Sequence, residues 1–150
     1  MRFEEHVESL ISEKYEKQDL IDQISYCYKL NDSNSERKII VAKDQKQVII
    51  YTENVNIKGN PNNVKNCIKY ISHINDYLQI GCFEMITGTF SFRFRTGQAF
   101  FADADPTKIT RFYLDYHDNI FPKIIDGLIQ VIEQNKNPTE SAQFIIRQLD

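Results

Sequence analysis

The chain has 150 residues, of which 41% are hydrophobic and 26% charged, and its formal net charge is -3. This length and composition are typical of one globular domain and argue against a disordered chain. The negative charge removes a general attraction to phosphate backbones and anionic lipid, and no apolar run reaches the roughly 18 residues of a membrane-spanning helix. We therefore expect one domain over residues 1–150, in the cytoplasm, with no nucleic-acid or membrane partner.

The cysteines, Cys27, Cys67 and Cys82, have no C-x-x-C spacing, and each lies within an apolar pattern. Cysteines of this kind are most often buried free thiols in a reducing compartment. The N-terminus agrees with that compartment, because it has acidic residues where a signal peptide has its apolar segment. We expect neither a disulfide nor a metal site from these thiols.

The first part of the chain predicts a helix followed by three strands. Apolar residues at helical spacing over residues 3–15 predict an amphipathic helix. Strict alternation over residues 24–30 predicts a strand with one buried face. The β-branched runs 38–42 and 48–52, joined by a charged stretch, predict a hairpin.

A second helix is predicted to begin at Asn60 and Pro61, which supply an N-cap side chain and a first helical residue. Its apolar stripe covers residues 64–78. Gly81 lies just past its end, where a left-handed residue is favourable.

A three-stranded meander is predicted next, over residues 82–86, 90–95 and 99–102. Gly88 and Gly97 mark the turns between these strands.

The last part of the chain predicts helices. Asp105 and Pro106 repeat the cap-and-proline signal, and an apolar stripe then follows to residue 132. Pro122 interrupts it, which indicates either a kink or a break into two helices, and we favour the kink. Asn137 and Pro138 begin a final short helix.

The predicted order is α-βββ-α-βββ-α-α. Strands joined by hairpins favour an antiparallel β-sheet with helices packed on one face, an α+β fold. The repeated helix and strand triplet hints at an internal duplication, but the residues do not align well enough to claim one.

Residues 71–95 carry a helix with Asn75 near its end, then Gly81, then a strand that begins Phe83-Glu84. In these features the chain resembles the YbjN family of bacterial sensory transduction regulators, whose fold is similar to that of type III secretion chaperones. The segment Phe92-Arg93, the late Pro122 and the terminal residues 137–142 match as well, so the resemblance covers residues 60–147. It implies a small α+β domain, often dimeric, that has no known catalytic residues and binds or regulates other proteins.

No residue set predicts catalysis, a metal or a cofactor. The three histidines, His6, His73 and His117, have no local partner for general-base chemistry, and the spacing of Cys67 and His73 puts them on different faces of one helix. The chain has no nucleophile elbow, zinc-protease, P-loop or dinucleotide fingerprint.

Two acidic segments have simple structural interpretations. The segment 115–118, which contains His117, is interpreted as the polar face of the third helix. Asp103 and Asp105 are interpreted as a turn and an N-cap.

The strand predicted over residues 90–95 alternates phenylalanine with polar residues. Phe90, Phe92 and Phe94 are expected to form the buried face of the sheet; an exposed RNA-binding platform is the alternative, although Thr87 stands where that motif needs a basic residue. Arg93 and Arg95 then project together from the other face, roughly 7 Å apart. They form either a solvated surface with ion pairs or a surface for an acidic protein partner or for self-association.

The leading hypothesis is a non-catalytic protein-binding domain, chaperone-like or regulatory, that uses Arg93 and Arg95 and forms a homodimer. One alternative is a small-ligand sensor. Its pocket, between helix and sheet, would be lined by Tyr26, Tyr28, Tyr113 and Tyr116. A single-stranded RNA binder is the third hypothesis.

Overall fold

The computed structural model describes residues 2–31, 34–44, 46–100 and 105–149. Its strands are β1 (Glu16–Asp19), β2 (Gln23–Lys29), β3 (Ser35–Ala42), β4 (Gln47–Lys58), β5 (Cys82–Ile86) and β6 (Ser91–Ala99). Its helices are α1 (Phe3–Glu8), α2 (Val64–Tyr77), α3 (Pro106–Glu133) and α4 (Pro138–Leu149). None of these helices is long and apolar enough to cross a membrane.

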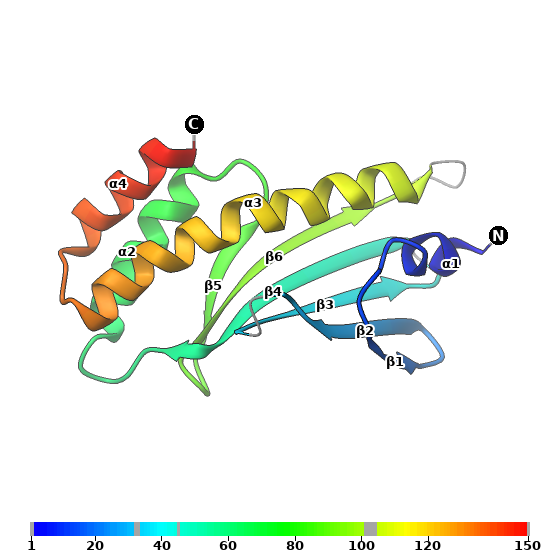
Figure 1. Cartoon of the computed structure of the whole chain (residues 1–150), viewed down its shortest axis with the longest axis horizontal. Coiled ribbons are helices and arrows are strands. Elements are labelled where there is room, and N and C mark those ends of the chain that lie inside the picture. Colours follow the sequence, from blue (N-terminus) through cyan, green and yellow to red (C-terminus); the bar gives the residue numbers. More distant parts are fainter. Residues whose placement is uncertain (1, 32–33, 45, 101–104, 150) are drawn as a thin grey trace.

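The strands form one antiparallel sheet in the order β1-β2-β3-β4-β6-β5. The described helices lie over one face of it, with α3 crossing the sheet and α2 and α4 packed beside the C-terminal half of α3 (Figure 1). The predicted α+β class, with an antiparallel sheet and helices on one face, is therefore confirmed.

The strands β2, β3 and β4 form where the alternation over residues 24–30 and the β-branched runs 38–42 and 48–52 predict them, because most of their inward side chains are β-branched or aromatic. Their hairpin is longer than expected, reaching from Ser35 to Lys58. β1 was not predicted. All four of its residues are exposed and polar, so it has no apolar period, and such charged edge strands discourage pairing with other chains.

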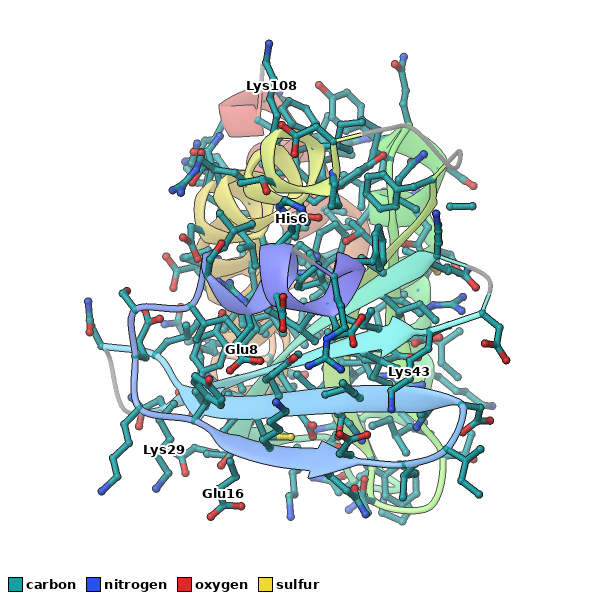
Figure 2. All side chains as sticks on the ribbon, turned by 90° about the vertical axis from the view of Figure 1, so that its right-hand side faces the viewer. His6, Glu8, Glu16, Lys29, Lys43 and Lys108 are labelled. Carbon is teal, nitrogen blue, oxygen red and sulfur yellow. The ribbon has the colours of Figure 1, made fainter. Side chains whose placement is uncertain are left out.

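The first helix is shorter than the predicted span of residues 3–15 and ends at Glu8. The Glu8 carboxylate accepts hydrogen bonds from the Tyr15 hydroxyl at 2.7 Å and the Tyr26 hydroxyl at 3.1 Å, and it pairs with Lys17 at 3.1 Å. Figure 2 shows Glu8 between α1 and the strands below it. These bonds, with that from Tyr15 first, lower the pKa of Glu8. The apolar side chains after Glu8 still pack on the core, but from a loop.

The second helix begins at Val64, three residues later than Pro61 would place it. Asn60 does act as a cap, since its Oδ1 accepts from the backbone N–H of Asn62 at 2.8 Å and of Asn63 at 3.2 Å, but these bonds form a turn that precedes the helix. Gly81 has the predicted positive φ, 81°. A side chain there would also collide with the Phe94 ring. Both the backbone conformation and the lack of space therefore require glycine at this position.

After α2 the chain forms two strands, β5 and β6, in place of the predicted three-stranded meander. The prediction of a turn at Gly97 is wrong. Gly97 and Ala99 both lie inside β6, which continues for nine residues. The predicted third strand, residues 99–102, ends outside the described residues. Phe90 is also not in a strand: it has a φ of 55° in the turn before β6.

The C-terminal helices begin at the predicted caps. Asp105 accepts from the N–H of Thr107 at 2.9 Å, and Asn137 accepts from the N–H groups of Thr139 and Glu140. Pro122 lies inside one continuous α3, so the alternative of a break into two helices is wrong. Gly127 lets α3 approach its neighbours, because a Cβ at this position would overlap Tyr70 and Ile145.

The interior contains two apolar clusters. The first lies between α2, α3, α4 and the strands β5 and β6, and includes Tyr70, Phe83, Phe94 and Leu128. The second lies between α1, the N-terminal half of α3 and the strands β2 to β4, and includes Val7, Tyr26, Ile39 and Leu114. The helix α3 and the central strands are shared between them.

Candidate functional site

The face of the sheet that no described helix covers, which we call the open face, has its side chains placed by strand register. One row of register partners crosses all the strands: Glu16, Cys27, Lys38, Tyr51, Arg95 and Cys82. The adjacent row is Lys29, Glu36, Glu53, Arg93 and Glu84. Figure 2 shows Glu16 and Lys29 on the side of the sheet away from the helices. Charges of both signs therefore lie close together on the open face.

Arg93 and Arg95 project together from the open face, as the alternation predicts. The Nε of Arg93 donates to Oε1 of Glu84 at 2.7 Å, and its guanidinium lies 4.5 Å from the centroid of the Tyr51 ring. The Nε of Arg95 is 3.5 Å from the same oxygen. One carboxylate thus faces two guanidinium groups and leaves them a net positive charge. Their role in binding a partner stays a prediction.

An apolar part of the open face adjoins these charges. Ile40 and Ile49 are register partners and are only partly buried, as is Tyr51. A hollow of about 270 Å³ lies over Ile40, Tyr51 and Arg93, and another of about 230 Å³ lies beside Ile49 and Arg95. The face therefore combines isoleucine, tyrosine and arginine in one shallow surface.

The opposite, helix-covered face contains a polar group that we call the Arg37–His117 cluster: the buried side chains of Arg37, Thr52, Thr96 and His117, and the exposed carboxylate of Asp118. The imidazole of His117 is fully buried and lies between two hydroxyls, with Nδ1 2.7 Å from Thr52 Oγ1 and Nε2 2.8 Å from Thr96 Oγ1. Arg37, 3% exposed, donates from Nε to Thr52 Oγ1 at 3.2 Å and from Nη2 to Asp118 at 2.8 Å.

Burial and, to a smaller extent, the nearby positive charge of Arg37 together lower the pKa of His117 to about 3. The imidazole is therefore neutral near pH 7. Because Thr52 already accepts from Arg37, its own hydroxyl proton is available to Nδ1 of His117. This arrangement favours the tautomer with the ring proton on Nε2, in which Nε2 donates to Thr96 Oγ1.

The cluster lies where the two apolar clusters meet. Along α3, His117 follows Leu114 of the second cluster and precedes Phe121 of the first. Across the sheet, Thr52 pairs in register with Arg37 on one side and with Phe94 on the other. The ring centroids of Phe94 and His117 are 4.7 Å apart. Polar contacts therefore join the two halves of the interior.

A cavity of about 250 Å³ opens beside the cluster. Arg37, Thr52, His117 and Asp118 line it together with Ser35, Asn31 and Glu13 and the apolar side chains of Leu30, Phe121 and Pro122. A cavity with convergent polar groups and one shifted pKa is a candidate ligand site.

Sequence reasoning missed this cluster, although the sequence contained a signal for the burial of Arg37 and another for the burial of His117. Arg37 continues the inward period of Ile39 and Val41, but the predicted strand began one residue later. His117 lies on the buried stripe of α3 between Leu114 and Phe121, so its assignment to a polar helix face was wrong.

The other histidines and the cysteines have separate partners. His73 Nε2 lies 3.2 Å from Thr139 Oγ1, and Cys67 Sγ lies 3.8 Å from Asn63 Oδ1. Cys67 is buried, but Cys27 is exposed on the open face and Cys82 is partly buried, so the prediction of three buried thiols is wrong for these two. In the described part of the chain, no three Cys, His, Asp or Glu side chains gather in a metal-ligating group.

The four tyrosines predicted to line one pocket divide between the two apolar clusters, with Tyr26, Tyr28 and Tyr113 in the second and Tyr116 in the first. Tyr26 donates to Glu8, Tyr113 to Gln98 at 2.9 Å and Tyr116 to the Ile80 carbonyl at 3.2 Å. Tyr28 is buried, which raises its pKa. Tyr28 and Tyr116 line two different hollows, and none of the four tyrosines lines the cavity beside Arg37, so a tyrosine-lined sensor pocket stays a prediction.

The predicted core role of the phenylalanines is confirmed for Phe92 and Phe94, which are both 0% exposed. Phe90 lies in the preceding turn and is only partly buried. The strand therefore offers no row of exposed aromatic rings on which bases could stack. Asp105 is the predicted N-cap, and Asp103 lies outside the described residues.

No family model, no curated protein and no solved structure matches the chain. The resemblance to the YbjN family accordingly stays an expectation.

Proposed function

We propose that the chain is a non-catalytic protein-binding domain, chaperone-like or regulatory, that takes a partner protein on the open face of its sheet. The observation that carries this proposal is the composition of that face. Ile40, Ile49 and Tyr51 form an apolar centre, and charged residues of both signs surround it. Protein interfaces have this form, with an apolar core enriched in tyrosine and arginine and a polar rim.

The partner expected on this face carries acidic groups beside an apolar segment. Arg95 is 48% exposed and shares Glu84 with Arg93. Its guanidinium can therefore donate hydrogen bonds to a further carboxylate, and no buried charge loses its partner when it does. A solvated face with ion pairs is the simpler interpretation of the arginines alone. The adjacent isoleucines and Tyr51 favour a docking surface over it.

The test compares capture by two charge-reversed variants. Lys38→Glu with Arg95→Glu changes the open face, and Lys65→Glu with Lys69→Glu makes the same change of charge on the exposed side of α2. In capture from native lysate followed by mass spectrometry, the open-face variant should lose a protein that wild type and the α2 variant both recover. Cross-links from Lys38, but not from Lys65 or Lys69, should reach that protein. Equal capture by the two variants would rule the open face out.

A second candidate function, a small-ligand sensor, is favoured by the cavity beside the Arg37–His117 cluster. Its buried guanidinium and its rim of Ser35, Asn31 and Asp118 would suit a ligand with both a carboxylate and a hydrogen-bonding group. A metabolite panel tested by thermal shift checks this candidate, because a ligand present at 100 times its Kd stabilises the fold by about 2.7 kcal/mol. A panel without any shift would count against the sensor.

A further inference from the structure

The helix α3 carries a second apolar stripe, formed by Ile109, Phe112 and Tyr116, that leaves Ile109 and Phe112 exposed. Thr110, Leu114, His117 and Phe121 face the sheet and are buried. At about 100° of rotation per residue, Phe112 points in the opposite direction, away from the sheet. Phe112 is 55% exposed and Ile109 38% exposed, although both are large and apolar.

This stripe is aromatic and ordered by its own contacts. The Phe112 ring stacks on Tyr116 with the centroids 6.3 Å apart, and it meets Tyr113 edge-on at 5.6 Å. The stripe leads into a hollow of about 460 Å³ that Tyr116, Ile120, Ile80 and Leu149 help to line. In Figure 1, α2 and α4 lie beside the C-terminal half of α3, and no described helix covers the outer side of its N-terminal half.

The charges beside Phe112 indicate what covers it. Lys108 and Arg111 precede Phe112, Asp115 follows it, and helical geometry puts all three on the same flank of the stripe. They are exposed, and none of them forms an ion pair with another described residue. In an antiparallel pair of α3 helices related by a two-fold axis near Phe112, Lys108 and Arg111 of each copy would lie beside Asp115 of the other. The flank is thus complementary to itself.

We propose that the N-terminal half of α3 is the dimer interface of this protein and that its occupant is a second copy of the chain, packed antiparallel with Phe112 at the centre. The two aromatic stripes cover each other, and the flanking charges pair at the rim. Because Phe112 points away from the sheet, both open faces remain free in such a dimer. The proposal is therefore independent of the proposed function, and a monomeric variant can still bind a partner protein.

The first test measures mass by light scattering and sedimentation over a concentration series of purified protein. Wild type should be a dimer, and Phe112→Glu should raise the dimer Kd about 30-fold or more, as loss of a central anchor does. Phe144→Glu on α4 is the matched control, since Phe144 is also an exposed helical phenylalanine, 47% exposed, and it should dimerise as wild type does. Far-UV circular dichroism should show that both variants are folded.

The second test uses charge and does not depend on Phe112. One variant carries Lys108→Asp and Arg111→Asp, and the other carries Asp115→Lys. Each alone should self-associate more weakly than wild type, because like charges then meet across the two-fold axis, whereas an equimolar mixture should recover the dimer. A mixture that associates no more strongly than either variant alone overturns the proposal. So does wild type that stays monomeric at about 100 µM, or a dimer that survives Phe112→Glu and is lost with Ile49→Lys on the open face.

Discussion

At the scale of single residues, the most informative feature is a set of buried polar groups that satisfy one another. His117 and Arg37 would each be costly alone in the interior, but Thr52 bonds to both of them and Asp118 balances the guanidinium. Removing one member leaves at least one buried polar group with a partner fewer. The cost of a substitution here should therefore exceed that of one average hydrogen bond.

The neutral, buried state of His117 predicts a pH dependence of folding. Its pKa is lowered to about 3 in the folded protein, whereas an unfolded chain has a histidine pKa of about 6.5. Between these values the unfolded state binds more protons, so this contribution is complete above pH 6.5 and is lost as the pH falls. We expect the contribution of His117 to the free energy of unfolding to be about 2 kcal/mol smaller at pH 5 than at neutral pH.

Urea unfolding of wild type and His117→Gln between pH 7.5 and pH 5 measures this contribution. The glutamine does not titrate, so the variant should lose less stability on acidification than wild type does. Parallel losses in the two proteins would show that His117 is not the source of the pH dependence.

At the scale of elements, the two edges of the sheet are protected in different ways. β1 is short, charged and exposed. β5 is instead blocked by a side chain of α2: the Asn75 carboxamide accepts from the N–H of Phe83 at 2.8 Å and donates to its carbonyl at 2.8 Å. The amide imitates the backbone of a neighbouring strand, which is one way to cover a sheet edge.

Asn75→Ala should destabilise the fold by about 1 to 3 kcal/mol, because both backbone groups of Phe83 lose their partner. Asn119→Ala provides a control, since Asn119 is an exposed asparagine on α3. Chemical unfolding checks the magnitude, and hydrogen exchange at Phe83 should accelerate in the Asn75 variant alone. Unchanged exchange there would contradict the assigned role of Asn75.

At the scale of the whole molecule, the two apolar clusters share α3, the central strands and the polar cluster between them. Neither half can open without breaking contacts of the other. We expect a single cooperative unfolding transition, in which far-UV circular dichroism and tyrosine fluorescence have the same urea midpoint. Separate midpoints would show that the clusters unfold as independent units.

The sequence by itself determined the features that depend on nearby residues. The alternation in β2, β3, β4 and β6, the Asp105 and Asn137 caps and the positive φ of Gly81 follow from side-chain pattern and backbone sterics, which act over a few positions. Even the joint projection of Arg93 and Arg95 is a local consequence of the strand period.

Tertiary structure decided what depends on distant partners. β1 has no apolar period and exists because β2 offers it an edge, and α1 ends early where Glu8 meets Tyr15 and Tyr26. Arg37 and Asp118 are 81 positions apart, so no local pattern could join them. Desolvation is a property of the assembled interior, which is why the lowered pKa of His117 and the cavity beside it could be recognised only from the fold.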